Sequence, residues 1–241
     1  MNTRVTSLIL LGGLAGASLA PATLAADSSV AEKNLTVEKT AGGDLGIQPL
    51  NHSALRFEYR GKQYYVDPAG QADWAHLPKA DAIFITHEHS DHLSLPTIAL
   101  LKKEGTLIFA NESSVKQAGF GTVIAVGEKK QVLDITVEAV PAYNLNPARQ
   151  QFHPKARKDN GYVLTFGDKR VYVAGDTEVT PEMKALQDIA IAFLPISLPN
   201  AAQSGPNRGA GTLARLAAVL RSGPGKNTAG KSARARASSK T

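Results

Sequence analysis

The sequence contains no cysteine, and this absence excludes two kinds of chemistry. Without thiols the chain cannot form a disulfide framework, and it has no thiolate to offer to a metal ion. Any metal site must therefore be built from histidine, aspartate and glutamate side chains. Long apolar runs are also scarce, because only the N-terminal segment approaches the length of a membrane span.

That N-terminal segment has the pattern of a secretory signal peptide. Arg4 is followed by the apolar stretch Ser7–Ala20 and then by small residues, which together are typical of a cleaved export signal. We therefore expect residues 1–26 to be a signal peptide cut after Ala25 or Ala26, and the mature protein to be exported, either periplasmic or secreted. A membrane anchor is the alternative, but the stretch is short for a bilayer span and contains three glycines.

Acidic and aromatic residues are missing from residues 200–241, which hold eight lysines and arginines. These eight account for the basic net charge of +6, since the rest of the chain has 19 Lys and Arg against 21 Asp and Glu. The main part of the chain thus gives no sign of binding a polyanion, and we expect no nucleic-acid partner. Residues 200–241 are of low complexity, and we predict a disordered basic tail.

Residues 27–199 have the composition of a globular domain in which strands and helices mix. Mixed elements of this kind indicate an α/β or α+β class with two sheet layers. The predicted strands are Leu55–Tyr59, Gln63–Val66, Asp81–Thr86, Thr106–Ala110, Val132–Val140, Gly161–Phe166, Arg170–Val173 and Ile189–Leu194. The predicted helices are Leu95–Lys103, Glu112–Ala118 and Pro181–Gln187.

A dense cluster of metal-ligand residue types follows the apolar strand that ends near Thr86. It contains His87, His89, Asp91 and His92 within six positions. On an extended strand end His87 and His89 point to the same side, because side chains alternate with period two. After a turn, Asp91 and His92 can reach a neighbouring point, so the spacing suits a two-metal site. A solvated polar loop is the simpler alternative, but it does not account for this density of imidazoles.

A second carboxylate, Asp176, follows the predicted strand Arg170–Val173 in the segment Gly175-Asp176-Thr177. A metal bridge could be made at this strand end, although Gly-Asp-Thr alone is a common turn. Together, the cluster on one strand exit and Gly-Asp-Thr on another resemble the metallo-β-lactamase-fold superfamily. Further segments resemble its branch of L-ascorbate-6-phosphate lactonases and N-acyl-phosphatidylethanolamine phospholipases D. These segments are His52-Ser53-Ala54, Val66-Asp67-Pro68, Pro141-Ala142-Tyr143-Asn144, Phe152-His153-Pro154-Lys155 and Pro181-Glu182-Met183.

The resemblance implies an αββα four-layer sandwich with a metal site at the sheet edges. It also implies hydrolysis of an ester, lactone, amide or phosphodiester in a small-molecule substrate by a metal-bound hydroxide. Zn²⁺ is the expected metal, two ions in the intact family, with Mn²⁺ or Fe²⁺ also compatible with these ligands. Carried over by position, the metal ligands are His87, His89 and His153 for the first ion, Asp91 and His92 for the second, and Asp176 as the bridge.

Other residues are expected to support this site. Asp91 is the candidate catalytic residue, because it could orient or deprotonate the attacking water. His52, Asp67, Asn144 and Thr177 are expected to line the substrate site or to orient ligands. For His52 a satisfied core histidine is the open alternative, and for Asp67 a plain Asp-Pro turn is the alternative.

The resemblance stops near Pro199. The branch pattern continues into a helix and a strand that end in a further histidine ligand, whereas this sequence has no histidine after His153. We therefore expect an incomplete fold at a truncated or frame-shifted C-terminus, with a divergent natural tail as the alternative. A catalytically impaired remnant that binds at most one metal is the alternative function. A basic-tail protein that binds nucleotide or nucleic acid is a third hypothesis.

Overall fold

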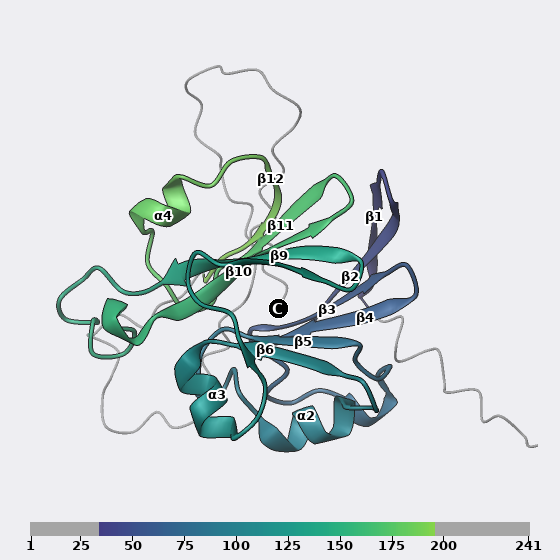
Figure 1. Ribbon diagram of the computed structural model, residues 1–241, viewed down its shortest axis with the longest axis horizontal. Coiled ribbons are helices and arrows are strands. Elements are labelled where there is room, and N and C mark those ends of the chain that lie inside the picture. Colours follow the sequence, from purple (N-terminus) through teal and green to yellow (C-terminus); the bar gives the residue numbers. More distant parts are fainter. Residues whose placement is uncertain (1–33, 196–241) are drawn as a thin grey trace, which may run out of the picture.

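The computed structural model describes residues 34–195 (Figure 1). The predicted signal peptide, residues 1–26, and the predicted basic tail, residues 200–241, lie outside the described residues. Within residues 34–195, none of the helices combines the length and the apolar character that crossing a membrane requires.

The first sheet has seven strands in the order β1-β2-β3-β4-β5-β6-β7. Its first four strands pair antiparallel through hairpins, and the pairs from β4 to β7 are parallel. Parallel pairing needs crossover connections, and the segments between these strands carry the helices of this half. The strands are β1 (Thr36–Thr40), β2 (Gly43–Asn51), β3 (Ala54–Tyr59), β4 (Lys62–Val66), β5 (Ala82–Ile85), β6 (Leu107–Ala110) and β7 (Thr122–Val123).

The second sheet has five strands in the order β12-β11-β10-β9-β8. All of its pairs are antiparallel except β11 with β12, which run parallel. The strands are β8 (Lys129–Val132), β9 (Ile135–Ala142), β10 (Asp159–Phe166), β11 (Lys169–Val173) and β12 (Ile189–Phe193).

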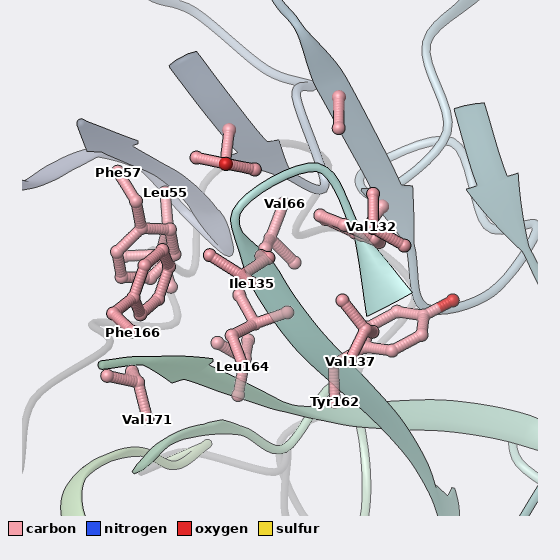
Figure 2. Close-up of a cluster of buried hydrophobic side chains, with 14 of the residues drawn as sticks. Leu55, Phe57, Val66, Val132, Ile135, Val137, Tyr162, Leu164, Phe166 and Val171 are labelled. Carbon is pink, nitrogen blue, oxygen red and sulfur yellow. The ribbon is translucent and has the colours of Figure 1, made fainter. Parts of the chain in front are cut away.

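The two sheets pack face to face around one apolar core (Figure 2). Phe57 and Val66 from the first sheet and Leu164 and Phe166 from the second are buried in this core. Along β10 the side chains alternate, so Val163, which precedes Leu164, belongs to a different cluster on the outer face. Side chains on both faces of β10 are therefore buried.

Helices cover the outer faces of both sheets, as Figure 1 shows. Next to the first sheet lie η1 (Trp74–His76), α2 (Leu95–Leu101) and α3 (Glu112–Ala118), and buried residues of η1 and α2 share one cluster with β5. Next to the second sheet lies α4 (Pro181–Lys184), whose Met183 packs against the outer cluster. This αββα arrangement confirms the predicted α/β sandwich of the metallo-β-lactamase type.

Helix boundaries follow from capping in the sequence. Ser94 and Asn111 accept hydrogen bonds from the backbone N–H groups of their first turns, and Gly119 ends α3 in the left-handed region. A short connector, η2 (Lys155–Arg157), precedes β10.

Two expectations about the elements need correction, and some strands were missed. The predicted strand Val132–Val140 is interrupted after Val132, the last residue of β8, because Leu133 adopts a positive φ of 52° in the turn that pairs Val132 with Ile135. The predicted helix Pro181–Gln187 ends at Lys184. The strands β1 and β2 were not predicted.

One edge of the sandwich gathers the ends of strands from both sheets. The Asn160 N–H donates a hydrogen bond to the Thr86 carbonyl (2.9 Å), and the Tyr162 hydroxyl donates to the Ile85 carbonyl (2.7 Å). These two bonds join β10 to the end of β5, so the segment after β5 lies directly beside the start of β10. The predicted ligand residues lie at this edge.

Candidate metal centre

The loop after β5 is built around the buried carboxylate of Asp67. This carboxylate accepts hydrogen bonds from the Thr86 N–H (2.7 Å) and the Thr86 hydroxyl (2.7 Å), and its Oδ2 lies 2.8 Å from His92 Nδ1. Asp67 therefore fixes the start of the loop and the orientation of the His92 ring. A carboxylate behind the far nitrogen of an imidazole is the arrangement that commonly orients metal-binding histidines.

Three imidazoles, those of His87, His89 and His153, form the first candidate ligand group. One ring nitrogen of each lies within 4.8 Å of the others. The ring centroids are 4.6 Å apart for His87 and His89, and 4.9 Å apart for His153 with either partner. His87 and His89 come from the loop after β5, whereas His153 comes from the loop between β9 and β10. The fold thus brings together residues that are far apart in the sequence.

The buried ring of His87 is in the form that binds metals. Burial, with further contributions from neighbouring imidazoles, holds its pKa well below the ordinary value. Its Nε2 atom is buried and has no hydrogen-bond partner. A neutral imidazole with an unpartnered nitrogen among other imidazoles is what a borderline transition metal requires.

Asp176 lies between this group and a second one. One carboxylate oxygen is 3.5 Å from His153 Nε2, and the other is 3.5 Å from His92 Nε2. Burial alone would raise the pKa of Asp176, but the neighbouring His92 ring lowers it below the ordinary value. An ionised carboxylate that faces imidazoles of both groups has the placement that a bridging ligand needs.

The close approach of Asp176 depends on Gly175. This residue has a φ of +64°, and a Cβ atom placed on it would lie 3.1 Å from the Thr86 Cβ and 3.0 Å from the Asn160 carbonyl oxygen. A glycine at this position lets the segment after β11 pass close to the end of β5.

The second candidate group contains Asp91 and His92. His92 Nε2 is buried without a hydrogen-bond partner and lies 4.0 Å from Asp91 Oδ2. Burial opposes protonation of His92, but the carboxylates of Asp67 and Asp176 outweigh it and raise its pKa to about 10. A cation bound at His92 Nε2 therefore has to displace a proton from the ring.

His52, from the turn between β2 and β3, reaches the same group. Its Nε2 atom lies 3.0 Å from Asp91 Oδ2, and one atom each of His52, Asp91 and His92 lies within 4.8 Å of the others. The hydrogen bond from His52 holds the pKa of Asp91 well below its usual range, so this half-exposed carboxylate is ionised at neutral pH.

Asn144 and Thr177 hold loops rather than ligands. The Asn144 N–H donates to the His153 carbonyl (2.9 Å), and its side chain donates to the Arg149 carbonyl. The Thr177 hydroxyl lies 3.0 Å from both the backbone nitrogen and the carbonyl oxygen of Tyr143. Both residues therefore position the loops that carry His153 and Asp176, and neither belongs to a ligand group among the described residues.

Arg157 is the main site residue that the sequence did not indicate. Its guanidinium donates to His89 Nε2 (3.0 Å) and to His153 Nδ1 (3.1 Å), and it is paired with the buried Asp159 (2.6 Å). It also lies 3.3 Å from the Glu88 carboxylate. The basic run around Arg157 is typical of a solvated loop. The available signal was Asp159, a carboxylate at the start of β10 next to His153, which could have indicated a basic partner there.

The donor set fits a divalent metal. Imidazole nitrogens and carboxylate oxygens are the available ligand atoms, and two buried imidazole nitrogens, His87 Nε2 and His92 Nε2, have no hydrogen-bond partner among residues 34–195. Such mixed nitrogen and oxygen ligands suit zinc and other borderline transition metals.

Comparison with known proteins places the chain in a family. A model described as "Beta-lactamase superfamily domain" matches residues 56–222. Because this match covers more than half of the chain, the protein belongs to the β-lactamase superfamily.

Individual relatives narrow the class. The chain is 30% identical over 167 residues to a UPF0173 metal-dependent hydrolase from Symbiobacterium thermophilum. The matched region covers 63% of this chain and 71% of that hydrolase. The chain is 31% identical over 176 residues to one from Flavobacterium johnsoniae, with 63% and 72% covered. A crystal structure of a candidate metal-dependent hydrolase from Parabacteroides distasonis has 46% identity and a TM-score of 0.66, covering 68% of this chain and 76% of that one. The predicted enzyme class, a metallo-hydrolase, is thereby confirmed.

Proposed function

We propose that this protein hydrolyses an ester, lactone, amide or phosphodiester bond in a small-molecule substrate with two divalent cations, Zn²⁺ in the first instance. One observation carries the proposal: ligand-type atoms from three separate loops converge at one edge of the sandwich, with Asp176 facing imidazoles of both groups. Structural packing alone gives no reason to leave the buried His87 Nε2 without a hydrogen-bond partner. The lactonase and phospholipase D-like branch remains a prediction.

The candidate ligands divide into two sets. His87, His89 and His153 would hold the first cation, His92 and Asp91 would hold the second, and Asp176 would serve both. When bound, such cations lower the pKa of water to about 7 and so supply a nucleophile at neutral pH. Asp91 is ionised and half-exposed, so its carboxylate can orient the attacking water, while its lowered pKa makes it a weak base.

The buried residues behind these ligands set their orientation. Asp67 fixes the His92 ring, and Arg157 donates to the rings of His89 and His153. Both of its contacts require an unprotonated ring nitrogen. The pKa of His89 is accordingly lowered, by burial first and by Arg157 second. These rings are therefore neutral, and the hydrogen bonds from Arg157 occupy the lone pairs that would have to be released when His89 and His153 hold a cation.

The test combines elemental analysis with a hydrolysis screen on the purified full chain. The screen uses p-nitrophenyl acetate, a γ-lactone, an acyl amide and bis-p-nitrophenyl phosphate, before and after chelation and readdition of Zn²⁺. The matched variants are His89→Ala, in the first group, and His76→Ala, whose ring contacts exposed Asp73 away from the site.

We expect about two ions per chain and turnover of at least one substrate, both of which His76→Ala retains. His89→Ala is expected to lose metal and turnover together. One ion or none, without turnover of any substrate class, would instead support the impaired remnant and contradict the proposal.

We propose further that residues 1–26 direct export, that residues 27–199 form the hydrolase domain, and that residues 200–241 are an appended basic tail. N-terminal sequencing of protein recovered from the periplasm or the medium tests the first part. A mature chain that starts at residue 26 or 27 is expected, and recovery of the intact N-terminus from the cytoplasm alone would contradict export.

A further inference from the structure

The turn between β2 and β3 is built to hold His52 against Asp91. His52 adopts a φ of +50°, a left-handed conformation that non-glycine residues seldom adopt. The next residue, Ser53, donates a hydrogen bond from its hydroxyl to the Asp91 carbonyl (3.2 Å). Two contacts, one from each residue of the turn, therefore fix its position relative to the metal loop. Backbone strain that a structure maintains in this way is common at functional sites.

His52 is also the one remaining imidazole that can reach the cluster. The sequence has six histidines, of which four belong to the groups described above, and the ring of His76 contacts Asp73. His52, His92 and Asp176 line a small shared cavity at the sheet edge. The His92 Nε2 atom makes no hydrogen bond and faces the carboxylates of Asp91 and Asp176.

We propose that His52 is a metal ligand, and that His52, Asp91 and His92 form the second cation site together with Asp176. The inference rests on the proposed function, because it assigns the ligands of the same metal centre. It adds a ligand from the N-terminal hairpin of the first sheet to a site whose other ligands follow β5 and β11.

The distances between donor atoms fit a shared cation. Ligand atoms at about 2.0–2.2 Å from a tetrahedral ion lie about 3.4 Å from one another. The observed separations are 3.0 Å from His52 Nε2 to Asp91 Oδ2, 3.5 Å from His92 Nε2 to Asp176 Oδ1, and 4.0 Å from His92 Nε2 to Asp91 Oδ2. These values lie on both sides of the ideal one, and one atom each of His52, Asp91 and His92 lies within 4.8 Å of the others.

The competing explanation is that His52 only donates a hydrogen bond to Asp91 and thereby orients it. Two substitutions separate the two roles. In His52→Ala both the ligand and the donor are lost, whereas in His52→Gln an amide N–H can still donate to Asp91 but the imidazole ligand is gone. His76→Ala serves as the matched control, because it removes an imidazole that lies outside the cluster.

The experiment titrates the metal-free full-length variants with Zn²⁺ by calorimetry and with Co²⁺ by NMR. We expect wild type and His76→Ala to bind two equivalents. Both His52 variants should keep the first equivalent and bind the second at least about 100-fold more weakly. In the Co²⁺ forms they should lose one hyperfine-shifted imidazole N–H signal. Retention of the first equivalent shows that the variant is folded.

Two outcomes would overturn the inference. If His52→Gln binds both equivalents with nearly wild-type affinity, His52 is only a hydrogen-bonding partner of Asp91. If wild type binds a single ion that His89→Ala abolishes and His52→Ala leaves intact, the second site fails. The first outcome leaves both cations of the proposed function in place, so failure of the His52 assignment is then distinguishable from failure of that function. The second outcome also removes the second cation of the proposed function, and the hydrolysis screen then shows whether a one-metal hydrolase remains.

Discussion

Replacing Asp67 with asparagine tests how strongly the conformation of the loop after β5, which carries His87–His92, depends on one buried carboxylate. Asp67 is fully buried and serves three donors: two from Thr86 and one from His92. Asparagine has nearly the same volume but only one acceptor oxygen, so at least one buried donor loses its partner. A buried donor without a partner costs about 1–3 kcal/mol, with more for a charged one. Because the charged His92 ring also loses its counter-ion, we expect Asp67→Asn to lower the unfolding free energy by about 2–4 kcal/mol.

The same substitution should weaken metal binding. Loss of a carboxylate behind a ligand imidazole typically lowers metal affinity by about 10–100-fold. Urea denaturation of the metal-free protein measures the stability change, and Zn²⁺ titration measures the affinity change. Asp44→Asn is the control, because its carboxylate forms an exposed pair with Lys39, and neither quantity should change measurably. If Asp67→Asn matches wild type in both assays, Asp67 is a plain turn residue and the reasoning is wrong.

Three further predictions concern pH and metal. Asp81 is partly buried and lies 2.8 Å from Lys103 Nζ; burial would raise its pKa, but the hydrogen bond from Lys103 lowers it. The ionised Asp81 carboxylate therefore adds to the free energy of unfolding fully above the ordinary aspartate pKa, and this contribution is lost as pH falls through the pKa of the folded state. Asp81→Asn should accordingly destabilise the protein at pH 7 and have little effect in strong acid. Equal effects of the substitution at both pH values would contradict this. Because the pKa of His92 is raised to about 10, metal uptake should release one proton and tighten about tenfold per pH unit near neutrality; a pH-independent affinity would refute it. The Asn160 amide, which donates to the Thr86 carbonyl between the sheets, should exchange with solvent more slowly once metal is bound, and unchanged exchange would show that the two sheets separate independently of the metal.

Much of the centre of the site could be predicted because its signals are local. An apolar strand followed at once by alternating histidines needs only the period of two to predict converging rings, and β5 ends at Ile85, directly before them. Asp176 was recognisable in the same way, as a carboxylate after the apolar strand β11. The start of α2 after Ser94 and the end of α3 at Gly119 could also be predicted, because capping is determined by one or two residues.

Features that depend on contacts distant in the sequence could not be predicted in this way. The hairpin at Leu133 needs a positive φ in a leucine, which no turn preference suggests. Arg157 contacts His89 across 68 positions, and His52 contacts Asp91 across 39. Nothing in the composition around Arg157 distinguishes its side chain from a solvated one, and the resemblance that indicated His52 did not identify Asp91 as its partner. Their partners follow only once the packing of the two sheets is known.

The candidate ligands come from both sheets, and hydrogen bonds between the sheets lie at the same edge of the sandwich. His87, His89 and His92 follow a strand of the first sheet, whereas His153 and Asp176 adjoin strands of the second. A cation held by both sets binds only when the two sheets are docked, so its binding free energy adds to the stability of the docked state. At a free metal concentration of 100 times the dissociation constant, this linkage is worth about 2.7 kcal/mol. The hydrogen bonds from Asn160 and Tyr162 to the end of β5 hold the same two sheets together before metal arrives, and thereby keep the ligand groups close enough to bind it.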